Sequence, residues 1–247
     1  MRVEIAMLSR TGARERNEDA LGVWSHDGVC YCVLADGAGG LGSGDRAAQL
    51  VVAEILAFLR AQPGCSGSAL HAALTAANRA LVAAQQADAR FATMRATAVL
   101  LALDTAAQQA VWAHLGDSRL YCFRAGAVEV QTIDHSVVQE MVSAGYLRAD
   151  QLRSAPERSQ LLGALGDAGD FEPQVQGQGF AVQPGDAFLL CSDGCWEPVD
   201  EAQMATDLAH SADAASWLQR LQQRIVERAA PRQDNYSAIA VRCSAAS

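Results

Sequence analysis

Four aspartates occupy equivalent places at the ends of apolar segments in this sequence of 247 residues. Asp36, Asp117 and Asp193 each follow such a segment, and Asp234 lies directly before the last one. If the last segment is a strand antiparallel to the others, all four carboxylates lie at one edge of the fold. Glu18 and Asp19 follow the first apolar segment after a short loop and can reach the same edge. One Asp-Gly pair alone is usually a turn, but four aspartates at one edge indicate a shared site.

Gathered carboxylates repel one another and destabilise a fold unless a cation neutralises them. An all-oxygen ligand set favours hard divalent ions such as Mg²⁺ or Mn²⁺. Two such ions about 3.5–4 Å apart can share a water molecule, lower its pKa and direct it at phosphorus. Arg14 precedes Glu18 by four residues, and its planar guanidinium matches the oxygens of a phosphate group. This constellation predicts metal-dependent hydrolysis of a phosphate ester.

The elements that must position these residues alternate between strand and helix patterns. Strands are predicted over residues 3–8, 29–35, 97–104, 110–117, 118–124, 127–134, 180–182, 186–193 and 235–243. Helices are predicted over residues 45–60, 69–86, 135–147, 200–210 and 213–229, and a glycine-rich turn over 37–44. The short spacing of the central strands favours an antiparallel meander, because parallel crossovers need more chain. With no repeat and no long linker, the sequence predicts one α+β layered sandwich over residues 1–247.

The composition suits one globular domain, since 50% of the residues are hydrophobic and 19% are charged. A net charge of −9 and a pI near 5.0 argue against nucleic-acid binding. All 19 basic residues are arginine, which excludes a P-loop lysine and Schiff-base catalysis. We expect a cytoplasmic protein without membrane association, because no apolar run is long enough to span a bilayer and the N-terminus is unlike a signal peptide.

The seven cysteines are expected to be reduced and to pack as small apolar residues. Neither close pair, Cys30 with Cys32 or Cys191 with Cys195, has the C-x-x-C spacing of a structural zinc site. Other phosphatase motifs are absent as well, because no cysteine precedes an arginine by six positions and neither D-x-D nor G-x-S-x-G occurs. The nucleophile is therefore predicted to be water.

Seven segments, in order and spread over nearly the whole chain, resemble the metal-dependent protein phosphatases of type 2C in their compact bacterial form. They are GARERNEDA (12–20), VLADGAGGLGSGDRAA (33–48), AHLGDSRLY (113–121), IDHSVVQEMVSAG (133–145), LLGALG (161–166), LLCSDGCWE (189–197) and QDNYSAIAV (233–241). The resemblance implies a four-layer α-β-β-α sandwich, with two central antiparallel sheets and a helix pair outside each. It also implies a mobile flap at about 135–162, beside the site, where substrate choice is tuned.

The resemblance further implies roles at the matching positions. Asp36 would bridge two metal ions, and Gly37 would supply a backbone carbonyl. Asp193 and Asp234 would hold the first metal, and Glu18 would act mainly through metal-bound water. Arg14 would bind the phosphate, so that Arg14, Asp36 and Asp193 form the catalytic set. Asp117 and Asp193 would offer a third, weaker metal site.

Three positions depart from the family pattern or remain open. Animal members carry a histidine, proposed as the general acid, where this chain has Ala38, so no general acid is assigned. Asp45 stands where the family usually has a glutamate and keeps its charge, so we expect no loss of activity. His135 matches a common family position, for which capping or packing is at least as good an explanation as catalysis.

The function implied by the resemblance is hydrolysis of phosphoserine and phosphothreonine in proteins, in opposition to a bacterial serine/threonine kinase. Some similar bacterial enzymes accompany type VI secretion systems, and a monomer is expected. One alternative is a catalytically weak relative that serves as a regulatory binding module. A remote alternative is a dinucleotide-binding oxidoreductase, because GAGGLG at 37–42 matches G-x-G-x-x-G. Against it, the charge of Asp36 would repel a pyrophosphate, and no βαβ unit is predicted.

Overall fold

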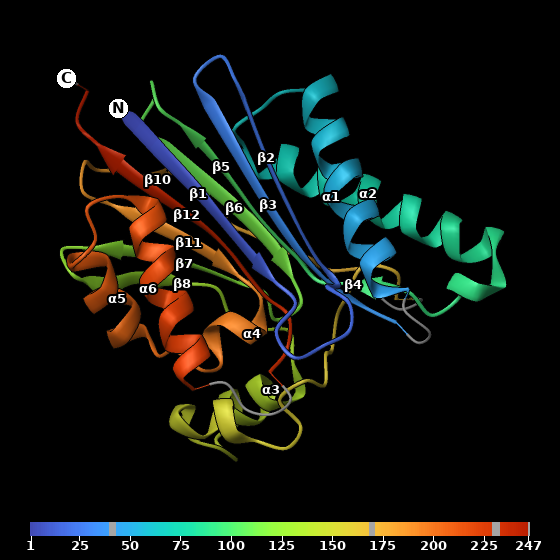
Figure 1. Cartoon of the computed structure of the whole chain (residues 1–247). Coiled ribbons are helices and arrows are strands. Elements are labelled where there is room, and N and C mark those ends of the chain that lie inside the picture. Colours follow the sequence, from blue (N-terminus) through green and yellow to red (C-terminus); the bar gives the residue numbers. More distant parts are fainter. Residues whose placement is uncertain (40–42, 168–170, 229–232, 247) are drawn as a thin grey trace.

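Two antiparallel sheets stack face to face in this computed structural model, which describes residues 1–39, 43–167, 171–228 and 233–246 (Figure 1). The first sheet has the order β1 (Arg2–Arg10), β12 (Tyr236–Ser244), β11 (Ala187–Cys191), β7 (Arg119–Arg124) and β8 (Ala127–Gln131). The second has the order β10 (Phe180–Ala181), β6 (Gln109–Leu115), β5 (Ala98–Asp104), β3 (Val29–Ala38) and β2 (Asp19–His26). Two short strands extend it, β4 (Arg95–Ala96) beside β3 and β9 (Gln174–Val175) beside β6.

Helix pairs cover the outer face of each sheet (Figure 1). The second sheet packs against α1 (Gly44–Ala61) and α2 (Gly67–Ala87), and the first against α5 (Glu201–Ala209) and α6 (Ala214–Glu227). The remaining helices among the described residues are short: η2 (Ala89–Phe91), α3 (Val137–Ser143), η3 (Ala149–Ser154) and α4 (Asp193–Trp196). Both chain termini lie at the end of the sheets away from α3 (Figure 1).

The alternation of side chains along β3 shows how the sequence specifies these layers. Cys32 and Leu34 are buried between the two sheets, whereas Tyr31, Val33 and Ala35 are buried against α1 and α2. A strand whose two faces are both buried is apolar throughout, which explains the continuous apolar run at 29–35. The structure therefore confirms the predicted four-layer α-β-β-α sandwich.

Strands β2, β4 and β9 of the second sheet were not predicted. Strand β2 is an edge strand whose residues are mostly half-buried, so its sequence lacks a clear alternating pattern. Gly22 interrupts the pattern for a packing reason, because a Cβ there would lie 2.6 Å from side-chain atoms of Val52 and Leu56 on α1. Because the helix packs this closely, position 22 is occupied by glycine, and the side-chain pattern from which a strand is predicted is interrupted there.

Several boundaries also differ from the prediction. Strand β3 continues to Ala38, so Asp36 lies inside the strand rather than after it. The predicted helix at 135–147 is shortened to α3, which begins two residues later, where the Ser136 hydroxyl accepts the N–H of Gln139 as the N-cap, and ends four residues earlier, at Ser143. The predicted turn at 37–44 lies partly outside the described residues. Residue 229, the predicted end of the last helix, also lies outside them.

The topology also rules out the dinucleotide-binding alternative. Strand β3 is antiparallel to β2, β4 and β5, and α1 is followed by α2 rather than by a parallel strand. A G-x-G-x-x-G fingerprint needs a parallel βαβ unit. The match at 37–42 is therefore coincidental.

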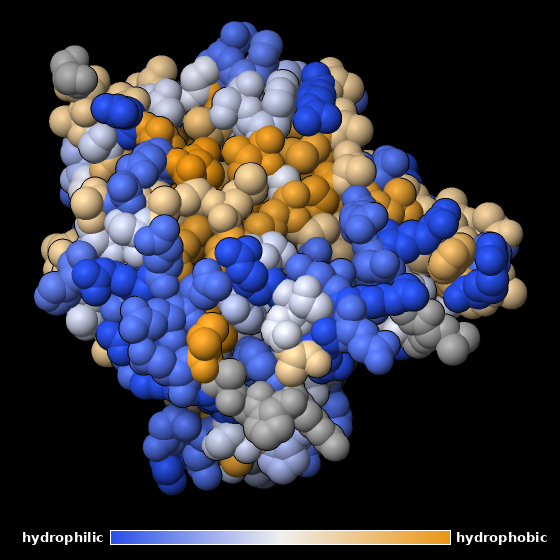
Figure 2. Space-filling model, viewed as in Figure 1, coloured by the Kyte–Doolittle hydropathy of each residue, from blue (hydrophilic) through white to orange (hydrophobic). Residues whose placement is uncertain are grey.

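Part of the surface is apolar where the edge strands β1 and β2 run side by side (Figure 2). Val3, Ile5, Leu21 and Val23 are half-buried there, and the side chain of Met7 is 57% exposed. Within the described residues, no helix combines the length and apolarity needed to cross a membrane.

Candidate functional site

All seven positions predicted from the sequence line a single cavity of about 280 Å³. They are Arg14, Glu18, Asp36, Gly37, Asp117, Asp193 and Asp234. Strand pairing explains the convergence, because Cys191 at the end of β11 pairs with both Ala238 of β12 and Arg119 of β7. The end of one strand and the beginnings of its two neighbours therefore lie together, as the antiparallel arrangement required.

Thr97 fixes the backbone around Asp36. Its hydroxyl oxygen accepts the Asp36 N–H at 3.2 Å, and its own N–H donates to the Asp36 carbonyl at 2.8 Å. The same hydroxyl lies 2.6 Å from that of Ser118, the residue after Asp117. The two aspartates are thus held on one hydrogen-bonded frame, although they come from different strands.

Gly37 permits the close approach of α1 to β3. A Cβ at this position would lie 1.9 Å from the carbonyl oxygen of Gly44, in the first turn of α1. No rearrangement of a flexible side chain could relieve that overlap, because the obstructing atom is backbone. Glycine is therefore required at this junction for packing, independently of any role of its carbonyl in binding a metal ion.

Asn235 attaches the loop that carries Arg14 and Glu18 to the beginning of β12. Its side-chain amide donates to the carbonyls of Thr11 at 2.7 Å and Arg16 at 2.8 Å. Its side-chain oxygen accepts the N–H of Glu18 at 2.8 Å. Segments more than 200 residues apart in sequence are therefore held in register at the cavity.

Arg14 is bound to a carboxylate of the cavity. Its Nη2 donates to Asp234 Oδ2 at 2.6 Å, and the side chains are 56% and 41% exposed. The residue predicted to bind phosphate and a residue predicted to bind metal are thus partners. A phosphate group and a cation would each compete for one half of this exposed ion pair.

Asp19 lies next to the site, although it is not among the residues that line the cavity or among the predicted ligands. It lies opposite Asp36 in the β2–β3 ladder and accepts a hydrogen bond from the Ser192 hydroxyl at 2.9 Å. Its other oxygen, Oδ1, is buried without a hydrogen-bond partner, and burial raises the pKa of Asp19 to about 6. Its position next to Glu18 was visible in the sequence, but the pairing with Asp36 depends on the unrecognised strand β2.

Burial and mutual repulsion make the ionised carboxylates of this cavity unfavourable. Burial, followed by the charges of neighbouring acidic residues, raises the pKa values of Asp36 and Asp193 well above their usual range. Burial raises the pKa of Asp117 to about 7, and the charge of Asp134 adds to the effect. Bound cations would relieve this repulsion, so the donor set fits hard divalent ions.

The carboxylates are not already arranged as a finished metal site. Across the part of the chain that the structure describes, no group of three or more His, Cys, Asp or Glu side chains is placed to hold a metal ion. Asp234 is paired with Arg14 in this arrangement, so a cation bound by Asp234 would compete with that ion pair.

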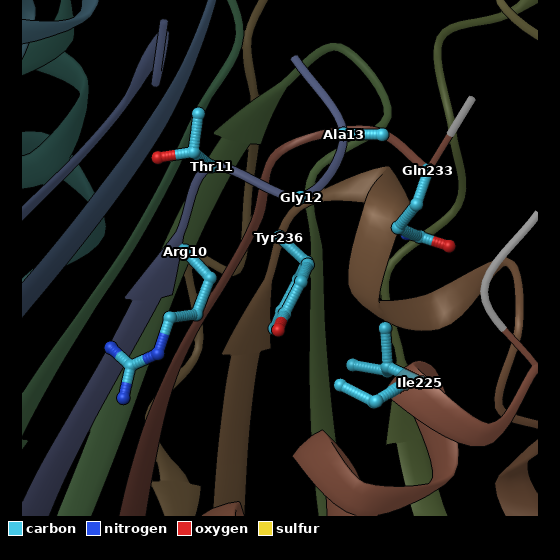
Figure 3. A pocket seen from close by; sticks show the side chains of 8 residues that line it. Arg10, Thr11, Gly12, Ala13, Ile225, Gln233 and Tyr236 are labelled. Carbon is cyan, nitrogen blue, oxygen red and sulfur yellow. The ribbon is translucent and has the colours of Figure 1, made fainter. Parts of the chain in front are cut away.

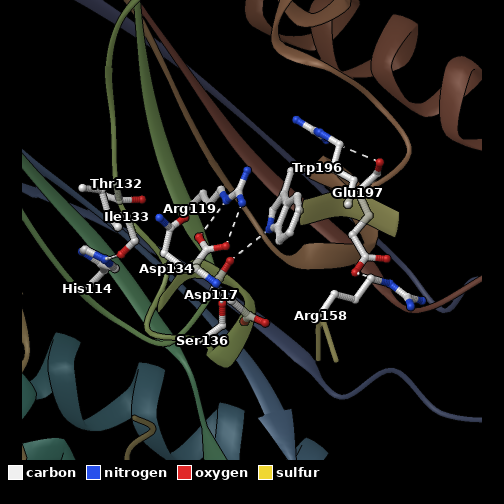
Figure 4. A network of polar contacts seen from close by, with 12 residues as sticks. His114, Asp117, Arg119, Thr132, Ile133, Asp134, Ser136, Arg158, Trp196 and Glu197 are labelled. Atoms are coloured by element: carbon white, nitrogen blue, oxygen red, sulfur yellow. Dashed lines mark hydrogen bonds and ion pairs between the residues drawn. The ribbon is translucent and has the colours of Figure 1, made fainter. Parts of the chain in front are cut away.

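A buried polar network contacts the backbone of Asp117 (Figure 4). Arg119 donates to both carboxylate oxygens of Asp134 at 2.7 Å and stacks on the ring of Trp196 at 3.5 Å. The Trp196 indole in turn donates to the backbone carbonyl of Asp117 at 2.9 Å. Sequence motifs gave no sign of this network, because it joins residues of β7, the loop after β8 and α4.

Three other positions of interest do not present catalytic groups. His135 accepts the N–H of Gly116 at 3.1 Å and packs on the ring of His114 at 4.8 Å, which favours a packing role. Ala38 lines the cavity, and no histidine is among the described lining residues. Asp45 accepts the N–H of Arg46 at 2.7 Å and does not line the cavity.

A separate cavity of about 380 Å³ lies between the end of β1, α6 and the start of β12 (Figure 3). Ile225 and Tyr236 contribute to its lining, and no described carboxylate does. It therefore lacks groups that could hold a cation or activate water, and the cavity around Asp36 is the candidate functional site.

Comparisons with known proteins agree on one family. Residues 9–235 match the sequence model of protein phosphatase 2C. The serine/threonine protein phosphatase PstP of Mycobacterium tuberculosis is 34% identical over 213 residues. The alignment covers 84% of this chain, which spans only 40% of the length of that relative.

Solved structures agree with this match. The catalytic domain of serine/threonine protein phosphatase PstP in complex with two manganese ions has a TM-score of 0.82 and 28% identity, over 98% of this chain and 99% of that one. PppA, a key regulatory component of T6SS in Pseudomonas aeruginosa, has a TM-score of 0.77 and 32% identity, over 98% and 97% of the two chains.

Proposed function

Because the chain belongs to the protein phosphatase 2C family, we propose that it hydrolyses phosphoserine and phosphothreonine in proteins. The observation that carries the proposal is the convergence of five acidic side chains and Arg14 on one cavity. Residues 1–247 would form one catalytic domain, with the flap at about 135–162 beside the site. Ser159 and Leu161, from the predicted flap, line the same cavity.

The cations are the next part of the proposal. Two Mn²⁺ or Mg²⁺ ions, with a third in a weaker site, would be held by Glu18, Asp36, the Gly37 carbonyl, Asp117, Asp193 and Asp234. When bound, such ions supply positive charge that neutralises the carboxylates and lowers the pKa of a shared water molecule. The oxygen-only donor set and the raised pKa values of Asp36 and Asp193 support this assignment, as does the similarity to PstP with manganese.

Arg14 would bind the phosphate, and Asp19 would supply a hydrogen-bond acceptor. Arg14 would bind and orient the phosphate through its planar N–H groups, since it lies at the cavity and its ion pair with Asp234 is exposed. Asp19 would keep an acceptor oxygen directed at the site, because Ser192 holds only its other oxygen. No side chain is proposed as general acid.

The partners follow from the substrate class. We propose phosphorylated proteins as substrates and a serine/threonine kinase as the opposing enzyme, with the chain acting in the cytoplasm as a monomer. The similarity to PppA supports a type VI secretion context. The net charge of −9 argues against nucleic acid as a partner.

The decisive experiment measures hydrolysis of p-nitrophenyl phosphate and of a phosphothreonine peptide, with Mn²⁺ and after exhaustive chelation. We expect turnover only with the metal, and none from Asp36→Asn or Asp193→Asn. Thermal unfolding with and without Mn²⁺ gives an independent reading, because the metal should raise the Tm of the wild type by more than that of either variant.

A matched control is Asp150→Asn, which removes an exposed carboxylate outside the cavity and should keep full turnover. Full phosphate release after chelation would end the proposal. No turnover under any condition, with Mn²⁺ stabilisation retained, would identify a regulatory binding module instead.

A further inference from the structure

A second cavity, of about 480 Å³, adjoins the carboxylate cavity and shares Arg14 and Asp234 with it. Its charge has the opposite sign. Four arginines and only two carboxylates are among its described lining residues: Arg14, Arg153, Arg158, Arg228, Glu197 and Asp234. In a chain of net charge −9, this local positive excess beside the proposed active site calls for a physical explanation.

Most of these arginines have carboxylate partners. Arg14 pairs with Asp234 at 2.6 Å, and Arg158 pairs with Glu197 at 2.9 Å next to Trp196 (Figure 4). Arg153 is paired outside the cavity lining, with Glu201 at 2.6 Å. These three pairs leave the charge of the fourth arginine uncompensated.

Arg228 makes no ion pair with any carboxylate of the described residues, although its side chain is held in place. Its Nη1 donates to the Pro198 carbonyl at 2.6 Å and to Gln203 Oε1 at 2.7 Å. The N–H groups of Nε and Nη2 have no hydrogen-bond partner in the described part of the chain. A guanidinium fixed on one side and free along its other edge is suited to two-point binding of a carboxylate or phosphate.

The opposite wall of the cavity is also ordered in advance. Arg153 donates to the Val199 carbonyl at 3.1 Å and to Glu201 at 2.6 Å, and it stacks on the ring of Trp196 at 5.5 Å. Side chains that are already immobilised lose little conformational entropy when a ligand binds. The cavity is therefore preformed rather than assembled by its ligand.

We propose that this cavity is a substrate subsite for an anionic group close to the phosphorylated residue, an assignment that rests on the proposed phosphatase function. A compact cavity of 480 Å³ is about 8 Å across, which corresponds to roughly two residues of extended chain. The anion is an Asp or Glu side chain, or a second phosphate, about two residues from the phosphate that is removed. Because Arg153, Ser154 and Arg158 belong to the predicted flap and line the cavity, this segment would select substrates by charge.

The test compares kcat/KM for phosphothreonine peptides that differ only in flanking residues, with the Mn²⁺-loaded full chain. One set has neutral flanks, a second has glutamate two positions before or after the phosphothreonine, and a third has phosphoserine there. We expect the anionic peptides to exceed the neutral one by about fivefold at low salt, with the advantage shrinking at high salt. The glutamate and phosphoserine arms distinguish the two sources of the anion.

Variants locate the effect. In Arg228→Gln the advantage of anionic over neutral peptides should fall to about one, whereas Arg220→Gln should retain it. Arg220 is exposed on α6, the helix that Arg228 caps, and lies outside the cavity, so Arg220→Gln makes the same change in charge without changing the cavity. If Arg228→Gln proves unstable, Arg158→Gln tests the same cavity from its other side.

The outcomes separate the subsite from the phosphatase activity. Hydrolysis of p-nitrophenyl phosphate is measured with every variant, so that a lost preference is distinguished from lost chemistry. Equal kcat/KM for neutral and anionic peptides, or a preference that survives both variants in the cavity, would overturn the subsite and leave the phosphatase proposal standing. Failure to hydrolyse any substrate would overturn the phosphatase proposal itself.

Discussion

Replacing Asp134 with asparagine changes one atom at the centre of a buried ion pair. The side chains of Arg119 and Asp134 are only 4% and 2% exposed, and Nε and Nη2 each donate to one carboxylate oxygen at 2.7 Å. An asparagine keeps one acceptor oxygen, but its NH₂ group would face the second guanidinium N–H, donor against donor. The charge of Arg119 would also remain buried without its counter-ion.

The size of the effect follows from what Arg119 retains. Removing one partner of a buried ion pair costs about 3–5 kcal/mol. Arg119 still donates to the Tyr121 hydroxyl at 3.0 Å, stacks on Trp196 at 3.5 Å and lies 3.8 Å from a Glu201 oxygen. We therefore expect the lower end, about 3 kcal/mol, which lowers the Tm of a chain of this size by about 6–12 °C.

The assay is chemical and thermal unfolding followed by far-ultraviolet circular dichroism, with Asp150→Asn as the control. Arg148 binds Asp150 in the same two-point geometry, at 2.9 and 3.0 Å, but with side chains 73% and 67% exposed. That control should leave the unfolding midpoint unchanged within error.

A double variant with apolar residues in place of Arg119 and Asp134 tests the cause. It should be more stable than Asp134→Asn, because no unpaired charge stays buried. If Asp134→Asn and Asp150→Asn unfold at the same midpoint, the reasoning from burial is refuted.

Three further predictions concern other parts of the molecule. Burial lowers the pKa of His114 from 6.5 to about 4, so the corresponding contribution to stability is fully present above pH 6.5 and is lost as the pH falls and the unfolded chain takes up a proton. Between pH 7 and pH 5, the wild type should lose about 2 kcal/mol more stability than His114→Gln in urea titrations. Parallel losses in the two proteins would contradict the shift. Gly12→Ala should destabilise the fold by more than about 1 kcal/mol and reduce turnover, because Gly12 has φ +62° and a Cβ would lie 2.2 Å from the Asp234 carbonyl oxygen. An unchanged stability in the same titrations would show that the loop can rearrange to accept a side chain. Arg14→Ala should raise KM more than it lowers kcat in steady-state kinetics, because the proposed role of the guanidinium is to bind the phosphate of the substrate. An unchanged KM would assign Arg14 to the surface.

The sequence predicted the layers because burial leaves a direct trace in residue type. The apolar run of β3, with Tyr31 and Val33 facing the helices and Cys32 and Leu34 facing the other sheet, needs both of its faces covered. Edge strands leave a weaker trace. The half-buried residues of β2, interrupted by Gly22, gave no pattern to recognise.

The candidate site was predictable to the extent that its residues follow strand ends. Asp36, Asp117, Asp193 and Asp234 were found in this way, and one cavity contains them all. Asp19 was placed near this edge together with Glu18 but was given no role, because its position opposite Asp36 depends on strand pairing. Arg119 could not be assigned either, since its role comes from three-dimensional contacts with partners that carry no motif.

The amide of Asn235 joins residues separated by 217 to 224 positions in the chain. During synthesis the ribosome releases the N-terminal loop long before it makes β12, and domains fold as their segments emerge. Arg14 and Glu18 therefore reach their working positions only after the final strand has joined β1. A nascent or prematurely terminated polypeptide would lack the assembled cavity, so the timing of translation itself would delay the onset of the proposed activity.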